Sequence, residues 1–317
     1  MSEPRVLVLD TDPSPRLDRL TGHARVVRAD EKGLADRLPE ADALLVWDFA
    51  SDAVRHAWPG PGPRPVWVHT ASAGVDRLLF PELLASPTVL TNARGVFDRP
   101  IAEYVAGLVL SMAKDFDGSR TLQSRRHWLH RETEKVYGSR AIVVGSGPIG
   151  RRIGGTLTAL GVDVALVGRT AREGVRASEE LPALLPGADW VVCAAPLTPA
   201  TTGMFDTAAF ALMKPSARFI NVGRGGHVVE EDLAAALRSG RLAGAALDVF
   251  TTEPLPPESP LWDLPGLVVS PHMSGDTVGW RDDLAEQFCD NFDRWRAGEP
   301  LVNVVDKRLG YVPSEAP

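Results

Sequence analysis

A glycine-rich turn between an apolar run and a helical pattern constrains this chain more than any other feature. The run Ala141-Ile142-Val143-Val144 is typical of a buried strand and leads directly into Gly145-Ser146-Gly147-Pro148-Ile149-Gly150. A helix-like stretch follows (151–160), and then a second strand-like run (162–167). In such a unit the first glycine permits a tight turn, the second lets backbone approach a pyrophosphate, and the third lets the helix pack on the strand. We therefore expect residues 145–150 to hold dinucleotide phosphates at a helix N-terminus.

Composition excludes several other classes of protein. The chain has 317 residues, of which 44% are hydrophobic and 24% charged, which is enough for two globular domains. A net charge of −7 argues against nucleic acid as a partner, and neither a polybasic cluster nor a long apolar run indicates a membrane. The two cysteines, Cys193 and Cys289, exclude a disulfide framework and a thiolate metal site. No signal peptide is recognisable, so we expect a cytoplasmic protein.

Short apolar runs alternate with helical patterns along the whole chain, which predicts parallel sheets built from βαβ units. Before the glycine turn these runs are 6–9, 43–47, 66–69 and 89–92; after it they are 190–195, 218–222, 243–249 and 267–270. We expect an α/β fold of two domains, with a Rossmann-type doubly wound parallel sheet inserted in a smaller flavodoxin-like α/β domain. The predicted bounds are 1–97 with 290–317 for the smaller domain, and 98–289 for the dinucleotide-binding domain. A long last helix (277–295) would return the chain to the smaller domain, where 301–305 would pack.

Two histidines, His127 and His130, lie in a basic stretch before the glycine turn and have a spacing that superficially suggests metal ligands. No further histidine, cysteine or carboxylate has a matching spacing, so the stretch is predicted to be a solvated or interface loop. We expect no metal site.

Three charged residues come just after predicted strands of the larger domain. Arg224 follows 218–222, Glu253 follows 243–249, and His272 follows 267–270. Each taken alone is compatible with a surface arginine, a solvated glutamate or a loop histidine. Ligands of open parallel sheets bind beyond the carboxyl ends of the strands, and all three residues fall on the edge that carries the glycine turn. Together they predict a catalytic site.

Several ordered motifs resemble the D-isomer-specific 2-hydroxyacid dehydrogenases, which use NAD or NADP. The resemblance covers nearly the whole chain, and its motifs are the glycine turn, Pro196-Leu197-Thr198 with Thr201, Asn221-Val222-Gly223-Arg224-Gly225, Leu247-Asp248-Val249-Phe250 with Glu253-Pro254, and Ser270-Pro271-His272 with Ser274-Gly275. One departure is Val229, where the family usually carries an acid. The resemblance implies the fold and chemistry of this family, that is, reduction of a small 2-oxo acid to the D-2-hydroxy acid by hydride transfer from NAD(P)H.

The resemblance also assigns roles to residues. It implies that Arg224, Glu253 and His272 are catalytic, with His272 as the proton donor, and that Ser72, Ala73 and Gly74 bind the substrate carboxylate together with Arg224. From the residues alone, Ser72 to Gly74 would be either a plain strand–helix turn or an anion-binding turn. Asp248 would lie near the nicotinamide, although a strand-end cap is the other interpretation. Further residues implied at the cofactor are Ala195, Pro196, Thr201, Val222, His272 and Ser274.

The end of the strand after the glycine-turn helix bears on which cofactor is used. A carboxylate there accepts a hydrogen bond from the adenosine ribose and repels a 2′-phosphate. This chain has Gly168 at that position, followed by Arg169 and Thr170, with Arg172 nearby. We therefore predict a preference for NADP, with NAD possible if Arg169 instead stacks on adenine.

Within the family the chain most resembles the glyoxylate/hydroxypyruvate reductases. Because the sequence ends soon after the last predicted helix, we expect no C-terminal regulatory extension like that of longer phosphoglycerate dehydrogenases. Glu253 stands where formate dehydrogenases pair their histidine with glutamine. Trp47, Arg94 and Phe97 are candidates for shaping the substrate pocket. Two alternatives stay open: a short phosphoglycerate dehydrogenase, and a dinucleotide-sensing, corepressor-like binding module. The resemblance implies a homodimer through the helix at 101–114 and the arm at 125–137.

Overall fold

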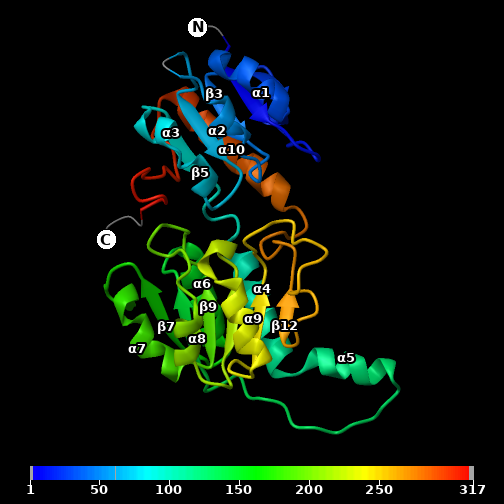
Figure 1. Cartoon of the computed structure of the whole chain (residues 1–317). Coiled ribbons are helices and arrows are strands. Elements are labelled where there is room, and N and C mark those ends of the chain that lie inside the picture. The colour runs from blue at the N-terminus through cyan, green and yellow to red at the C-terminus, as the bar shows by residue number, and fades with distance from the viewer. Residues whose placement is uncertain (1–2, 61, 314–317) are drawn as a thin grey trace. The chain divides into compact units, whose positions relative to one another are not determined.

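The computed structural model describes residues 3–60 and 62–313, which form two compact units (Figure 1). The first unit comprises Met1–Phe97 with Thr277–Pro317, and the second comprises Asp98–Asp276. The chain thus returns to the first unit at 276/277 and not at the predicted 289/290. The reason is α10 (Trp280–Ala297), whose buried aromatic face packs in the first unit, where Phe288 stacks on Trp67 with ring centroids 5.1 Å apart. A helical pattern shows which face is buried but not which core that face joins.

The first unit is a five-stranded parallel sheet in the order β2-β1-β3-β4-β5, which is the flavodoxin-like order. Its strands are β1 (Arg5–Leu9), β2 (Arg25–Ala29), β3 (Ala43–Val46), β4 (Trp67–Thr70) and β5 (Val89–Asn92), and its other helices are α1 (Glu31–Arg37), α2 (Ala53–Ala57) and α3 (Pro81–Ala85). The prediction that 301–305 packs in this unit is confirmed, because Val304 forms an antiparallel bridge to Thr91 in β5.

The second unit contains a seven-stranded parallel sheet in the order β12-β11-β10-β9-β6-β7-β8. This is the Rossmann order, in which the strand sequence reverses between β6 and β9, and it confirms the predicted fold class. The strands are β6 (Arg140–Val144), β7 (Asp163–Gly168), β8 (Val175–Ala177), β9 (Trp190–Cys193), β10 (Arg218–Asn221), β11 (Gly244–Leu247) and β12 (Leu267–Val269).

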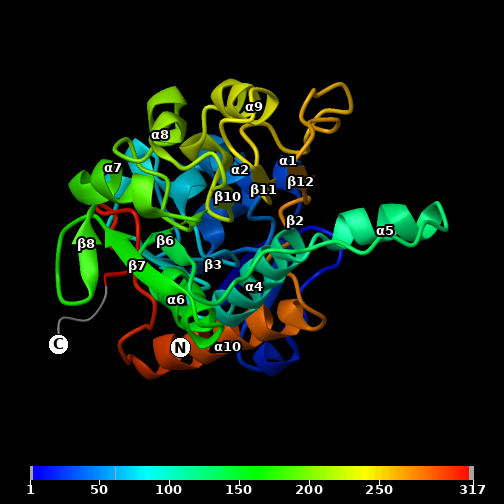
Figure 2. The same cartoon turned by 90° about the horizontal axis from the view of Figure 1, so that it is seen from below.

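Helices pack on both faces of this second sheet, as a doubly wound fold requires. Figure 2 shows α4 (Asp98–Ala113) and α6 (Pro148–Ala159) on one face, and α7 (Leu181–Leu184), α8 (Thr207–Leu212) and α9 (Glu230–Arg238) on the other. The four central strands β6, β9, β10 and β11 are mostly buried and largely apolar, as expected where helices cover both faces, whereas β7, β8 and β12 near the edges are only partly buried.

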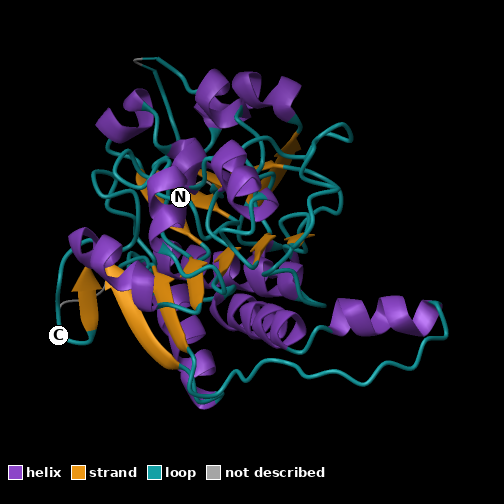
Figure 3. Ribbon diagram, turned by 60° about the horizontal axis from the view of Figure 1, so that its bottom comes forward, coloured by secondary structure: helices purple, strands orange, loops and turns teal. Residues whose placement is uncertain are grey.

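One segment of the second unit extends away from its sheet. Helix α5 (Phe116–Ser124) and the following irregular segment form a projecting arm (Figure 3). The arm leaves large apolar side chains in solvent: Trp128 is 97% exposed, and Phe116 and Leu129 are about half exposed. His127 and His130, both exposed, lie on it as well.

Residues 3–60 and 62–313 contain neither a helix long and apolar enough to span a membrane nor a group of three or more histidine, cysteine, aspartate or glutamate side chains arranged to hold a metal ion. Both cysteines are free and buried, and burial raises the thiol pKa of Cys193 to about 12 and that of Cys289 to about 11.

Candidate active site

The second unit places a histidine and a glutamate in direct contact beyond the carboxyl ends of two neighbouring strands. His272 follows β12, and its Nδ1 lies 2.8 Å from Oε2 of Glu253, which follows β11. The other carboxylate oxygen of Glu253, Oε1, accepts a hydrogen bond of 2.8 Å from the backbone N–H of Phe250. Both oxygens are engaged, so the carboxylate is held in place and fixes Nδ1 of His272 as the donor towards it. Nε2 is then the ring nitrogen available for chemistry.

The charge on Glu253 is favoured by its surroundings. Partial burial acts to raise the pKa of the Glu253 carboxyl, but the hydrogen bonds from His272 and Phe250 and the positive charges of His272 and Arg224 outweigh it, so the pKa lies below its usual value. The carboxylate is therefore ionised at neutral pH and can accept the hydrogen bond from Nδ1 of His272. Because Arg224 contributes to this shift, the structure brings all three predicted residues into one electrostatic neighbourhood.

Arg224 is carried by a turn after β10 that two buried side chains hold in shape. The amide of Asn221 spans the turn, donating from Nδ2 to the Arg224 carbonyl at 2.9 Å and accepting from the Gly223 N–H at 3.0 Å. Nδ1 of His227 lies 3.0 Å from the backbone nitrogen of Arg224 and 2.9 Å from its carbonyl oxygen, so it bonds to the Arg224 backbone in either tautomer. Neither Asn221 nor His227 was among the predicted site residues, although Asn221 stands in one of the family motifs. The signal available in the sequence was the presence of polar side chains next to the predicted catalytic Arg224, because polar side chains that become buried usually form hydrogen bonds.

Asp248 organises the loop that carries His272. Its buried carboxylate accepts hydrogen bonds from the Ser270 hydroxyl at 2.7 Å, the Met273 N–H at 3.0 Å and the Ser274 N–H at 2.9 Å. These contacts show Asp248 holding the loop after β12, and its place near the nicotinamide stays a prediction. Ser274, predicted at the cofactor, contributes its backbone to this network and is itself buried.

The glycine turn between β6 and α6 has the backbone geometry that the sequence predicts. Gly145 has φ +118°, and a Cβ there would lie 2.4 Å from the carbonyl oxygen of Ala194. A Cβ on Gly150 would lie 1.7 Å from the carbonyl oxygen of Gly145, so the third glycine lets the helix close on the turn. Gly147, in contrast, has open space where its Cβ would be. The turn is therefore packed tightly on its inner side and open at the glycine predicted to approach a ligand.

The end of β7 is shaped around Ser146. A Cβ on Gly168 would lie 2.4 Å from Oγ of Ser146, so an acidic side chain at 168 would force this hydroxyl to move. Arg172 donates to the same Oγ at 2.8 Å and to the Ser146 carbonyl at 3.2 Å. Arg169 and Thr170 are exposed beside it. This corner of the sheet edge is cationic and contains no carboxylate at the strand end.

The remaining residues predicted at the cofactor lie at the ends of β9 and β10. Val222 donates its N–H to the carbonyl of Cys193 at 3.0 Å, which keeps these two strand ends together, and Ala195 is almost fully buried next to them. Oγ1 of Thr201 donates to the Pro196 carbonyl at 2.8 Å and closes the loop after β9. The loop is thus folded back on itself along the sheet edge.

In the first unit, the turn at Ser72, Ala73 and Gly74 follows β4. All three carbonyls accept hydrogen bonds, from the Ala93 N–H, from Nδ2 of Asn92 and from Oγ of Ser72 respectively. Within residues 3–60 and 62–313, no acceptor is found for the three N–H groups of this turn. The carbonyls of this turn are bonded within the protein and its N–H groups point elsewhere, an arrangement that suits an anion. It favours an anion-binding turn over a plain strand–helix turn.

The three candidates for shaping a substrate pocket have different environments. Arg94 donates from its guanidinium to the carbonyls of Val312 and Pro313, and so braces the C-terminal segment. Phe97 is buried and packs against Trp280, with ring centroids 6.0 Å apart. Trp47 is also buried, and it lines a cavity of the first unit.

Comparisons with known proteins give one consistent result. The family described as "D-isomer specific 2-hydroxyacid dehydrogenase, NAD binding domain" matches residues 106–274. Glyoxylate/hydroxypyruvate reductase A of Serratia proteamaculans (strain 568) is 31% identical over 303 residues, covering 88% of this chain and 95% of that protein.

Solved structures agree with this result. An NADPH-dependent glyoxylate/hydroxypyruvate reductase from Sinorhizobium meliloti, in complex with NADP and sulfate, has a TM-score of 0.84 and 30% identity, covering 97% of this chain and 100% of that one. A D-isomer specific 2-hydroxyacid dehydrogenase from Xanthobacter autotrophicus Py2, in complex with NADPH and MES, has a TM-score of 0.81 and 30% identity, covering 98% and 100%.

Proposed function

This chain belongs to the D-isomer-specific 2-hydroxyacid dehydrogenase family, and from that premise we propose that it reduces a small 2-oxo acid, of the size of glyoxylate or hydroxypyruvate, to the D-2-hydroxy acid. The second unit is the dinucleotide-binding domain and the first is the substrate-binding domain. The observation that carries the proposal is the pairing of His272 with Glu253, near Arg224, on the sheet edge that begins with the glycine turn.

The residues of the second unit fit a dinucleotide. Gly147 has open space at the start of α6, and the first turn of a helix offers N–H groups and a positive dipole end to phosphates. Residues 145–150 would hold the pyrophosphate, with the loop at Ala195, Pro196 and Thr201 and the strand end at Val222 beside them. When bound, the reduced nicotinamide supplies the hydride that adds to the carbonyl carbon.

His272 supplies the proton for the carbonyl oxygen. Glu253 accepts from Nδ1 and stabilises the imidazolium form, so Nε2–H is the group that can donate as negative charge develops on the substrate oxygen. After donation the neutral imidazole takes a new proton from water, because 44% of the His272 side chain is exposed. The reverse reaction uses the same atoms, with Nε2 accepting the proton of the hydroxyl.

Arg224 and the turn at Ser72 bind the acid itself. The guanidinium offers several N–H groups in a planar fork, which suits a carboxylate and can also stabilise charge on the carbonyl oxygen. Ser72, Ala73 and Gly74 offer backbone N–H groups to the substrate carboxylate. Asp248 and Ser274 act through the loop that carries His272, since their hydrogen bonds determine its shape.

NADP is the preferred cofactor in this proposal. Gly168 leaves the strand end without the carboxylate that would repel a 2′-phosphate, and Arg169, Thr170 and Arg172 surround the position. The Sinorhizobium meliloti and Xanthobacter autotrophicus relatives were solved with NADP and NADPH respectively, which supports the same choice.

The test is a panel of 2-oxo acids with both cofactors. Purified protein is mixed with NADPH or NADH and with glyoxylate, hydroxypyruvate and longer 2-oxo acids, and loss of absorbance by the reduced cofactor is followed. We expect oxidation of NADPH, with a higher kcat/KM than for NADH. If the protein binds NADPH but oxidises it with none of these acids, the enzyme assignment falls and the dinucleotide-sensing alternative replaces it.

We also propose that the protein is a homodimer in which the projecting arm covers a second copy. Trp128, Leu129 and Phe116 are large apolar side chains left in solvent on this arm, and such exposure is typical of association surfaces. Sedimentation of the wild type at micromolar concentration should give the mass of a dimer, and Trp128→Ser with Leu129→Ser should shift the mass towards a monomer. A monomeric wild type would refute this part of the proposal.

A cytoplasmic location completes the proposal. The support is chemical: both cysteines are free, and a reductase needs a continuous supply of reduced cofactor. Cell fractionation with an antibody to the protein tests it.

A further inference from the structure

A pocket of about 290 Å³ lies at the carboxyl edge of the first unit's sheet. Its lining comes from the segment after β1 (Pro13 to Arg16), from Trp47 directly after β3, and from the segment Thr277–Asp282 that begins α10. β1 and β3 are neighbours in the sheet, and the order of strands reverses between them. In open parallel sheets this switch point is where ligands bind. Of its lining residues, Trp47 was predicted to shape a substrate pocket, and none belongs to the catalytic residues, the turn at Ser72 or the residues predicted at the cofactor.

Two indole rings give the pocket firm walls. Trp47 is 4% exposed, and its Nε1–H donates to the Pro13 carbonyl at 2.9 Å. Trp280 is 8% exposed and packs edge-on against Phe49, with ring centroids 6.4 Å apart. Both rings are held by the protein itself, so a ligand would not need to order them.

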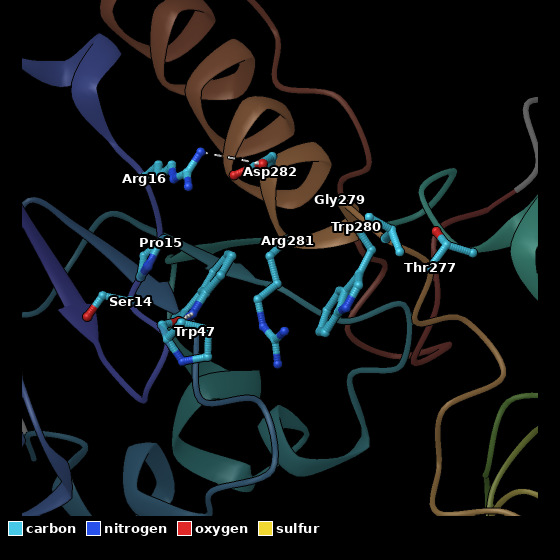
Figure 4. A pocket seen from close by; sticks show the side chains of 11 residues that line it. Ser14, Pro15, Arg16, Trp47, Thr277, Gly279, Trp280, Arg281 and Asp282 are labelled. Atoms are coloured by element: carbon cyan, nitrogen blue, oxygen red, sulfur yellow. Dashed lines mark hydrogen bonds and ion pairs between the residues drawn. The ribbon is translucent and has the colours of Figure 1, made fainter.

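One cation points into the space between these rings. Arg281 extends between Trp47 and Trp280 (Figure 4), with its guanidinium carbon 4.5 Å from the centre of the Trp280 ring. The other arginine of the lining, Arg16, faces the carboxylate of Asp282 at 3.8 Å. Across residues 3–60 and 62–313, no carboxylate forms an ion pair with Arg281. A guanidinium stacked on a ring keeps its N–H edge available for an anion.

We propose that this pocket binds a second anionic group of the substrate, a carboxylate or a phosphate, distinct from the 2-oxo carboxylate. The inference rests on the proposed function and narrows its substrate class to 2-oxo acids with an acidic group at the far end. The turn at Ser72, which takes the 2-oxo carboxylate, follows β4, the neighbour of β3, so both anion sites lie on one sheet edge of one unit. A planar fork binds carboxylate or phosphate with two parallel hydrogen bonds.

The test compares substrates that differ in this group. With saturating NADPH, kcat/KM is measured for glyoxylate, for 2-oxoglutarate and for 3-phosphohydroxypyruvate, in the wild type and in Arg281→Gln. We expect the wild type to turn over at least one of the two larger acids. For a larger acid that the wild type turns over, kcat/KM is divided by kcat/KM for glyoxylate. In Arg281→Gln this ratio should fall about 30-fold, as when one partner of a charge pair is removed. The two larger acids distinguish a carboxylate site from a phosphate site.

Arg296→Gln is the matched control. Arg296 lies on the same helix, is exposed, and stacks on Phe292 at 5.9 Å, but it lies outside the pocket. Arg296→Gln removes the same charge from α10, so it should leave the ratio of kcat/KM for the larger acid to that for glyoxylate within about twofold of the wild type. An equal loss for glyoxylate and the larger acids in Arg281→Gln, or an equal change in the ratio in Arg296→Gln, would overturn the proposal.

A binding measurement separates this inference from the proposed reaction. If no 2-oxo acid oxidises NADPH, the proposed function fails, and the pocket is then tested by titrating 2-oxoglutarate into the NADP-loaded protein in a calorimeter. Binding by the wild type that Arg281→Gln weakens supports the pocket. A wild type that neither binds nor turns over the larger acids contradicts it.

Discussion

The two units are built on the same plan but prepare their sheet edges differently. Both are parallel sheets whose strand order reverses once, so both offer a site beyond the strand ends. In the second unit that edge is packed so closely that glycine is required, since a Cβ at Gly145 would overlap the Ala194 carbonyl. In the first unit the corresponding edge has ordinary side chains, with Trp47 and Arg281 around a pocket and the turn at Ser72 beside it. Topology therefore places a site, and local packing decides whether backbone or side chains line it.

The difference also separates recognition from chemistry. The second unit contains the proton-transfer pair His272 and Glu253, whereas the first unit offers N–H groups and an arginine, which can bind an acid but are poorly suited to exchanging protons at neutral pH. The following changes test this division, beginning with the largest expected effect.

Replacing the proton donor should cost the most. In His272→Ala we expect kcat to fall about 10²–10³-fold, because no group then supplies the proton as charge develops. NADPH affinity, measured by fluorescence titration, should change less than about threefold, since the glycine turn is untouched. His130→Ala, an exposed histidine of the arm, is the control and should keep wild-type turnover. Near-normal kcat in His272→Ala would show that the chemistry lies elsewhere.

The glycine requirement can be tested with two glycines of one helix. Gly150→Ala puts a Cβ 1.7 Å from the Gly145 carbonyl oxygen, so we expect about 3 kcal/mol of destabilisation and loss of NADPH binding. Gly155→Ala lies in the same helix with open space around its Cβ, so it should stabilise the protein by about 0.5 kcal/mol and leave NADPH affinity unchanged. Thermal unfolding and NADPH titration measure both effects. Equal behaviour of the two variants would mean that packing under the turn does not matter.

Much of this architecture could be predicted from the sequence, and the failures have physical reasons. Buried parallel strands are continuous apolar runs, so most strands of both sheets were recognisable. β2 and β8 were not. Arg25 and Arg28 interrupt the apolar pattern of β2, an edge strand that is only partly buried, and β8 is an edge strand of three residues with Arg176 at its centre. The return crossing was misplaced because an amphipathic helix does not reveal its partner, and Phe288 of α10 joins the first core and not the second.

The candidate site divides in the same way. Arg224, Glu253 and His272 were predicted to share a site because each follows the end of a strand, and a parallel sheet brings the ends of its strands together. The residues that hold the turn carrying Arg224 could not be predicted. Asn221 and His227 act through hydrogen bonds within this short turn, and the sequence does not specify its shape. The pocket around Arg281 needed knowledge of which strands are neighbours, because its lining comes from three separate segments.

A buried histidine gives the first unit a specific response to acid. His69, on β4 beside the edge strand β5, is fully buried, and burial lowers the pKa of its imidazole to about 3. Below pH 6.5 this imidazole takes up a proton in the unfolded chain but not in the folded unit, so the contribution of His69 to stability is unchanged above pH 6.5 and decreases below it. At pH 5 the loss should be about 2 kcal/mol, from 1.36 kcal/mol per pH unit. Hydrogen exchange of peptides covering β4, at pH 7.5 and pH 5, measures it within the whole protein.

The variant His69→Asn separates titration from packing. It keeps a side chain that can bond to Oγ1 of Thr91, the partner of His69 at 2.8 Å, but it cannot take up a proton. We expect a lower stability than wild type at pH 7.5 and no additional loss from this site at pH 5. An unchanged pH dependence in the variant would assign the acid sensitivity to other groups.

The smallest expected effect concerns the cationic corner beyond β7. In Arg169→Ala the kcat/KM for NADPH should fall about tenfold, equivalent to about 1.4 kcal/mol, because a charged contact to the 2′-phosphate is lost. The kcat/KM for NADH, which lacks this phosphate, should change less than twofold. Arg176→Ala removes an equal charge from the neighbouring strand β8, where Arg176 pairs with Glu180 at 3.4 Å, and should leave the NADPH to NADH ratio unaltered. A matching loss for both cofactors in Arg169→Ala would instead indicate stacking on adenine, and the phosphate preference would then have to come from Arg172 and Thr170.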